Sequence, residues 1–196
     1  MLKYLVFVGI FVSFLGTLSY IKEVIKGRVK PNTVTWFIWS LAPLIAAAAA
    51  IVDGVGLAAL PVFAEGFFPL MIFIIALFKK GALTKLTKFD IGCGVLSIMS
   101  LILWYITKKP VVAIAISILS DFFAALPTII KSWKYPETED SFAYFSGLVN
   151  ASTSFAAIKV WNFSSMAFPI YIILLSGLIT TFIERHRIFR RRKKPA

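Results

Sequence analysis

The chain has little of the chemistry on which most enzymes and metalloproteins depend. Its 196 residues include one cysteine, Cys93, and one histidine, His186. A lone cysteine excludes an intrachain disulfide. Since Cys93 lies in an apolar run and His186 lies in the tail, we expect no Cys/His pair or Ser/His/Asp set inside the membrane, and no metal-ligand cluster. A glycine-rich phosphate-binding loop is also missing. We therefore expect a protein that is not an enzyme and that holds no metal and no cofactor.

Charged residues are scarce as well, at 15% of the chain, whereas 59% of the residues are hydrophobic. This balance excludes an ordinary soluble domain. Apolar runs of about 20 residues, long enough for a helix to cross a lipid bilayer, recur throughout the sequence. The alternation expected of membrane strands is absent. The predicted fold class is therefore an all-α integral membrane protein that has the lipid bilayer as a partner.

Seven such runs predict seven transmembrane helices, joined by short connections and followed by a basic tail. The expected spans cover roughly residues 3–25, 34–52, 56–78, 89–107, 110–130, 141–158 and 165–183.

Negative charge is rarer than positive charge, with nine acidic and 21 basic residues. Seventeen of the basic residues lie in alternate connections and in the tail, and the other four are Lys3, Lys108, Lys109 and Lys159. By the positive-inside rule, this pattern places the N-terminus outside and the C-terminus in the cytoplasm, as in a plasma (inner) membrane protein. The tail lacks a folded basic surface, so we expect no nucleic-acid partner. The sequence leaves homo-oligomerisation open.

An internal repeat organises the chain. At an offset of 105 residues and without a gap, the segment 20–45 aligns with the segment 125–150. The identical pairs are Ile25 and Ile130, Lys26 and Lys131, Pro31 and Pro136, Thr33 and Thr138, and Phe37 and Phe142. Further along, Phe68-Pro69 matches Phe168-Pro169 at an offset of 100. Each half is therefore predicted to be a three-helix unit.

Two three-helix units joined directly would be inverted relative to each other, and the fourth span makes them parallel. The predicted plan is 3+1+3, with residues 1–80 as the first repeat, 81–109 as the linker helix, 110–184 as the second repeat and 185–196 as a basic cytoplasmic tail. Parallel repeats around an axis normal to the membrane are a standard transporter plan, in which the substrate site lies between the repeats near mid-bilayer.

The stretch LPTIIKSWKYPETEDSF, residues 126–142, resembles the PQ-loop motif, in which Pro-Gln ends the first helix of a three-helix unit before a basic turn. Pro127 matches the motif, Thr128 stands in place of its glutamine, and Lys22-Glu23 stands at the corresponding place in the first half. The 3+1+3 plan is similar to that of the SWEET sugar transporters and their PQ-loop relatives, which include amino-acid carriers and the KDEL receptor. The resemblance implies alternating access, with Pro127 as a hinge.

Two carboxyl groups in apolar sequence are the strongest candidates for function. Asp121 lies in the fifth span on one helical face with Ser117, and Glu65 lies in the third span. A carboxylate inside the bilayer costs several kcal/mol unless it faces a cavity or a partner. Each residue is therefore predicted either to bind substrate or couple protons, or to form a structural hydrogen bond between helices. For Glu65, a position at the outer mouth is a further alternative.

Other polar and aromatic residues have two interpretations each. Ser146 and Asn150 share a stripe of the sixth span and either line a pore or bond across helices. Trp36 and Trp39 open the second span and form an interfacial belt, or Trp39 stacks on a sugar ring or closes an inner gate. Prolines inside spans allow bending, as at Pro43. The turn acids Glu137, Glu139 and Asp140 cap the sixth span or form a gate with Lys131 or Lys134.

Together these features predict a transporter that moves a small polar solute, sugar-like or amino-acid-like, by alternating access and with proton coupling. The alternative is a non-transporting receptor or assembly factor on the same scaffold, which binds a peptide or lipid. The second repeat is expected to supply most of the polar groups of the site between the halves, because Gly16 and Ile45 stand where the second half has Asp121 and Asn150.

Overall fold

The computed structural model describes residues 2–107 and 109–191, and within these residues every regular element is helical. The α-helices are α1 (Leu5–Ile25), α2 (Thr33–Val52), α3 (Ala59–Phe78), α4 (Lys88–Thr107), α5 (Pro110–Lys134), α6 (Ser141–Thr153) and α7 (Phe163–Arg191). Short 3₁₀ turns, Leu2–Tyr4, Gly56–Ala58, Pro136–Thr138 and Ser154–Ala156, extend or connect them.

Local sequence explains where several helices begin and end. The side chain of Asn32 caps α2 by accepting hydrogen bonds from the backbone N–H groups of Val34 and Thr35, at 3.0 and 3.1 Å. Thr87 and Asp90 form a reciprocal capping box at the start of α4. Gly27 follows the end of α1 with φ +74°, a left-handed conformation that glycine adopts without strain.

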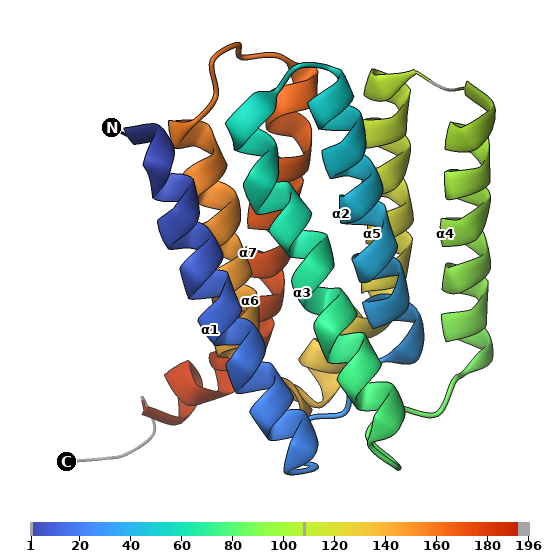
Figure 1. The fold of residues 1–196 in the computed structure, drawn as a ribbon. Helices are drawn as coiled ribbons and strands as arrows, with labels where there is room; N and C mark the ends of the chain where they lie inside the picture. Colours follow the sequence, from blue (N-terminus) through green and yellow to red (C-terminus); the bar gives the residue numbers. More distant parts are fainter. Residues whose placement is uncertain (1, 108, 192–196) are drawn as a thin grey trace.

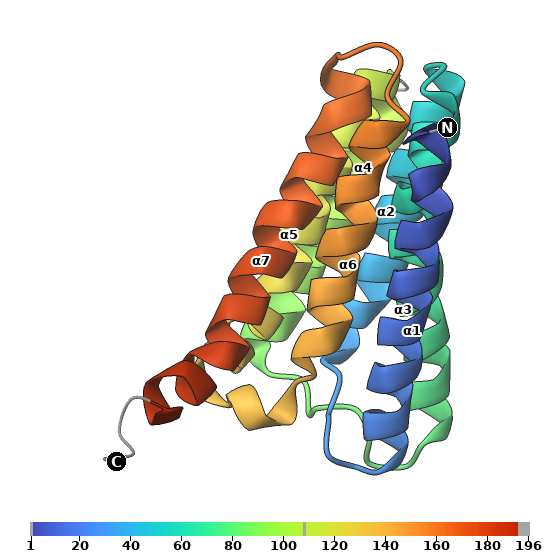
Figure 2. The same cartoon turned by 90° about the vertical axis from the view of Figure 1, so that its left-hand side faces the viewer.

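Six of the seven helices form a closed ring, in the order α1, α3, α2, α5, α7 and α6, and each contacts its two neighbours in that order. Successive helices run in opposite directions, so the N-terminus and the C-terminal helix end lie at opposite ends of the bundle (Figures 1 and 2). The fourth helix stands at one edge of the bundle, where it packs against α5 and α2 (Figure 1).

Five helical segments are long and apolar enough to cross a membrane: Leu2–Ile25, Thr33–Val52, Gly56–Phe78, Val111–Lys134 and Phe163–Arg185. They coincide with five of the expected spans. The expected sixth span, 141–158, is α-helical only in its first part. Its α-helix, α6, has 13 residues and is followed by the 3₁₀ turn Ser154–Ala156. The expected fourth span corresponds to α4, which has 20 residues but is not among these five segments.

The surface of the bundle differs from that of a soluble protein, although much of the interior is apolar in the usual way. Large apolar side chains such as Phe11, Ile102 and Leu174 are exposed on the outside of the bundle. Polar side chains such as Ser117 and Thr128 are buried inside it. A soluble monomer rarely exposes large continuous apolar patches, whereas a lipid-facing surface requires them. This distribution is compatible with an integral membrane protein.

Glycines bring two of the ring helices into close contact. A Cβ atom on Gly16 of α1 would lie 2.7 Å from the Ser146 Cβ and 3.3 Å from the Ala143 Cα of α6. A Cβ on Gly9 would lie 3.0 Å from the Cα of Asn150. Small residues at this spacing let helix backbones pack closely, so α6 is held in register against α1.

Candidate functional site

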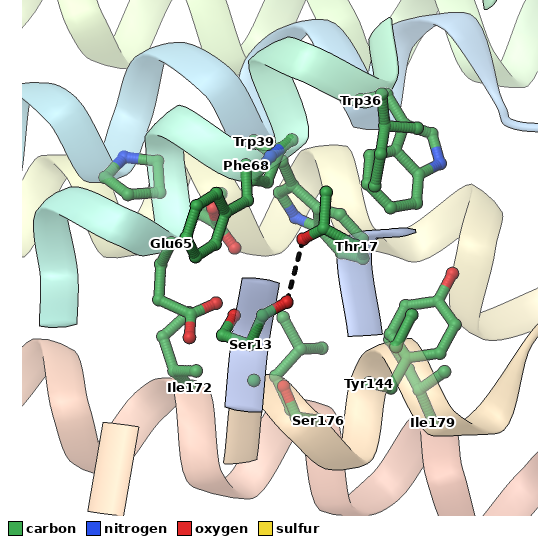
Figure 3. A pocket seen from close by; sticks show the side chains of 17 residues that line it. Ser13, Thr17, Trp36, Trp39, Glu65, Phe68, Tyr144, Ile172, Ser176 and Ile179 are labelled. Atoms are coloured by element: carbon green, nitrogen blue, oxygen red, sulfur yellow. Dashed lines mark hydrogen bonds between the residues drawn. The ribbon is translucent and has the colours of Figure 1, made fainter. Parts of the chain in front are cut away.

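A cavity of about 70 Å³ lies within the ring, and every ring helix contributes to its wall. It is lined by Ser13, Thr17, Trp36, Trp39, Pro43, Glu65, Phe68, Pro69, Ile72, Asp121, Ala143, Tyr144, Gly147, Ile172, Leu175, Ser176 and Ile179. Figure 3 shows Glu65 and Tyr144 on opposite sides of this space. None of the described residues of α4 contributes to the lining.

Glu65 is held in place from the opposite half of the chain. Its Oε1 accepts a hydrogen bond of 2.8 Å from the side-chain amide of Asn150, which also donates to the Pro61 carbonyl at 3.0 Å. A Cβ on Gly147 would lie 3.3 Å from Glu65 Oε2, so the glycine leaves room for the carboxyl group. Asn150 therefore orients Glu65 in the cavity wall.

Asp121 is the second carboxyl group in the wall and is 1% exposed. Its Oδ2 accepts a hydrogen bond of 2.7 Å from the Tyr171 hydroxyl. Its Oδ1 is buried without a hydrogen bond, as is the indole N–H of Trp39, which acts on the same carboxyl group. Buried polar atoms are almost always hydrogen-bonded, so an orphaned carboxyl oxygen in a cavity wall marks a place for a ligand or water.

Small polar groups complete the middle of the cavity. Ser13 and Thr17 lie one turn apart on α1, and the Thr17 hydroxyl donates to the Ser13 carbonyl at 2.9 Å (Figure 3). Ser176 faces them from α7. Helical spacing of four residues places Ser13 and Thr17 on the same face of α1, and that face borders the cavity.

Four aromatic side chains form one end of the cavity, which we call the aromatic floor: Tyr20, Trp36, Trp39 and Tyr144. The ring centroids of Tyr20 and Trp36 are 4.5 Å apart, and those of Trp39 and Tyr144 are 6.1 Å apart. All four side chains are buried. Since they come from α1, α2 and α6, the floor joins both halves of the chain.

A buried ion pair lies beyond the aromatic floor. Glu139 Oε2 accepts hydrogen bonds from the hydroxyls of Tyr20 and Tyr144, at 3.0 and 2.8 Å, and its Oε1 lies 2.7 Å from Lys131 Nζ. The Glu139 side chain is 0% exposed and that of Lys131 is 14% exposed. Lys131 Nζ also bonds to the Lys30 carbonyl. We call this set of contacts the latch.

The structure brings several of the sequence-predicted residues together. Asp121, Glu65, Trp39 and Pro43 line the cavity, and Asn150 lies behind Glu65. Three of the predicted residues do not line it, namely Ser117, Ser146 and Pro127. Ser117 is buried with an unpartnered hydroxyl, Ser146 bonds to the Ala143 carbonyl within its own helix, and Pro127 is buried inside α5.

Two of the alternatives left open by the sequence are decided by the structure. Trp36 and Trp39 are buried in the floor rather than exposed in a belt. Of the turn acids, Asp140 caps α6 by accepting from the Phe142 N–H, whereas Glu139 belongs to the latch. The expectation that the second half supplies most polar groups is wrong, because the first half contributes Ser13, Thr17 and Glu65 as well as both indoles.

Tyr20, Tyr144 and Tyr171 were missed as site residues, since a tyrosine in an apolar span gives no sign of its partner. The sequence indicates these tyrosines only through the acids to which they bond, Glu139 and Asp121, because each buried carboxylate needs a hydrogen-bond donor. For metals, the described residues contain no group of three His, Cys, Asp or Glu side chains that could hold an ion.

No protein-family model, curated protein or solved structure matches the chain.

Proposed function

We propose that this protein is a membrane carrier of the 3+1+3 class, which moves a small polar solute between two parallel three-helix halves by alternating access. The observation that carries the proposal is the cavity at the centre of the ring, with two buried carboxyl groups in a wall built from both halves.

The helix contacts support the two-repeat plan. Within the first half α3 lies between α1 and α2, and within the second half α7 lies between α5 and α6. Between the halves, α1 contacts α6 and α2 contacts α5. If the two halves are interchanged, α1 takes the place of α5 and α2 takes the place of α6, so the α1–α6 contact and the α2–α5 contact replace each other. This is expected for repeats related by an axis along the bundle. The PQ-loop resemblance of residues 126–142 points to the same plan.

In this proposal the latch and the aromatic floor close the cytoplasmic end of the cavity. The basic connections lie at the same end of the bundle as the latch (Figure 1), which by the positive-inside rule is the cytoplasmic side. Opening requires separation of α6 from α1 and α5 at that end. Pro127 in α5 and Pro43 in α2 each remove a backbone hydrogen bond within a helix and serve as bending points.

Protons are the proposed coupling ion. Neither Glu65 nor Asp121 forms an ion pair in the described part of the chain. Protonation would neutralise either group when no solute is bound.

Uptake into liposomes that contain the purified protein tests this function, with and without an inward proton gradient. Using a mixture of labelled small polar solutes, we expect protein-dependent uptake that the gradient accelerates. Asp121→Asn and Glu65→Gln should abolish the acceleration, and Ser152→Ala, on the exposed side of α6, should retain it. Uptake that both carboxyl variants leave unchanged refutes the proton role. A complete lack of uptake favours the receptor alternative.

A further inference from the structure

We infer that the cavity is selective for a small organic cation of the ammonium or guanidinium type, rather than for a sugar or an amino acid. The prediction that such a cation is transported rests on the proposed function. The prediction that it binds rests on the cavity alone.

The charge of the lining favours a cation. Its ionisable groups are Glu65, Asp121 and Tyr144, and among the described residues that line it there is no lysine, arginine or histidine. The nearest cation on the floor side, Lys131, lies beyond the floor and is already paired with Glu139. A carboxylate on the solute would therefore find two like charges and no counter-ion in the wall. This disfavours anions and also the zwitterionic form of an amino acid.

The cavity also offers the contacts that an organic cation uses. Asp121 Oδ1 is a buried acceptor without a hydrogen bond, and the protein donor that acts on this carboxyl group besides Tyr171 is the indole N–H of Trp39, which is also without a hydrogen bond. The N–H groups of an ammonium or guanidinium can complete the contacts of Oδ1 with a charge-assisted hydrogen bond. Trp36, Trp39, Phe68 and Tyr144 contribute aromatic rings to the lining. A cation close to aromatic faces is stabilised by the ring quadrupole, most strongly when it is desolvated.

The volume limits the size of the occupant. An apolar cavity of about 150 Å³ holds benzene, which has six heavy atoms. The cavity here, at about 70 Å³, is about half as large, so it admits about three or four heavy atoms. In this conformation a hexose with its ring hydroxyls does not fit. Guanidinium, with four heavy atoms, matches both the volume and the acidic wall.

Guanidinium and urea form a matched pair for the test, because they are nearly the same in shape and differ in charge. Binding to the detergent-solubilised protein is measured by isothermal titration calorimetry at low millimolar concentrations, with glycine and acetate as the zwitterionic and anionic probes. We expect guanidinium to bind and the other three probes to bind at least about 30-fold more weakly, since a buried charge pair is worth at least about 2 kcal/mol.

Two variants locate the site, and a third controls for folding. Asp121→Asn and Glu65→Gln preserve side-chain volume and should each weaken guanidinium binding at least about 30-fold. Ser152→Ala lies outside the cavity, on the exposed side of α6, and should bind guanidinium to within a few-fold of the native protein. If one carboxyl variant does not yield monodisperse protein, guanidinium binding to the other variant tests the inference.

The outcomes separate the inference from the function. Guanidinium binding that depends on both carboxyl groups supports the inference, whether or not liposomes show flux. Equal binding of urea and guanidinium, binding of glycine or acetate, or guanidinium binding that survives both substitutions overturns it. Carboxyl-dependent uptake of glucose or glycine without guanidinium binding overturns the inference while supporting a carrier. Guanidinium binding without flux of any labelled solute supports the cation site and rejects the carrier.

Discussion

The amide of Asn150 links the two halves of the chain at the level of single atoms. Asn150 is fully buried on α6, and its side-chain amide donates two hydrogen bonds to α3, to Glu65 and to the Pro61 carbonyl. A carboxyl group inside a bundle needs such a donor to hold one orientation. The side chain of Asn150 is thus a positioning group for the cavity rather than a part of its surface.

Replacing Asn150 by alanine should destabilise the bundle and loosen Glu65. We expect a loss of about 1 kcal/mol in the free energy of unfolding, the size typical of hydrogen bonds between membrane helices. Solute binding should weaken as well, because Glu65 loses its fixed orientation. The free energy is measured by titrating the protein from mild detergent into SDS.

Ser152→Ala is the matched control for this prediction. Ser152 lies on the same helix, is exposed, and bonds to the Leu148 carbonyl of its own helix. It should change the free energy of unfolding by a few tenths of a kcal/mol. If the Asn150 and Ser152 variants unfold alike, the link between α3 and α6 is unimportant for stability.

Sequence reasoning finds the acids of this site and misses their donors, for a physical reason. Asp121 and Glu65 can be identified because a charge in an apolar run is costly wherever its side chain points. Tyr20, Tyr144 and Tyr171 cost little in the same runs, since a tyrosine ring is mostly apolar. Their roles depend on which helices become neighbours, and that is a property of the packed bundle.

At the scale of single helices, two glycines of α1 permit a close contact with α6. Gly16 and Gly9 are separated by two helical turns on the face of α1 that meets α6. The apolar runs were sufficient to predict where the helices lie, since a bilayer demands about 20 apolar residues. They could not predict the short α6, or the extension of α5 to Lys134, because tertiary contacts decide where a helix ends.

Gly16→Ala should separate α1 from α6. The new Cβ would meet the Cβ of Ser146 at 2.7 Å, so one helix has to shift. Overpacking of this kind costs about 1–3 kcal/mol, and the thermal midpoint measured by circular dichroism in detergent should fall. Adding Ser146→Gly should restore part of the loss.

Gly92→Ala is the control for added helix propensity. A Cβ on Gly92 of α4 would meet nothing within 4 Å. Alanine there should leave the thermal midpoint unchanged or raise it, since glycine in a helix interior costs roughly 0.5–1 kcal/mol. A Gly16→Ala protein that melts at the native temperature would show that the α1–α6 contact tolerates a wider spacing.

On the scale of the whole molecule, the proposed function assigns to the latch the closure of the basic end of the cavity. Glu139 is surrounded by two tyrosine hydroxyls and Lys131. Removing one partner of a buried pair leaves an uncompensated charge and costs about 3–5 kcal/mol. The protein can avoid this cost by opening the end of the bundle so that water reaches Glu139.

Lys131→Met should therefore increase access to the cavity from the basic end. Cys93 is the only cysteine in the chain, so a Cys93→Ser background allows one reporter cysteine to be placed at Ser176. We expect a membrane-impermeant maleimide applied from that end to label it at least about tenfold faster in the Lys131→Met protein, given the energy of the pair.

Lys134→Met provides the comparison, because Lys134 is exposed and lies one turn further along α5. It removes the same charge from the same helix end without touching Glu139, and the labelling rate should stay at the native value. Equal acceleration by both substitutions would indicate a general effect of surface charge and would contradict the latch.

The place of α4 outside the ring has a consequence for how such a protein can vary. All contacts that close the ring are made by the other six helices, and α4 is attached at its side through α5 and α2. Reciprocal hydrogen bonds between Ser97 and Ser120 fix it there. Under the proposed two-repeat plan, two separate three-helix chains could form the same cavity wall, and the role of α4 is that of a covalent tether that keeps one copy of each half together.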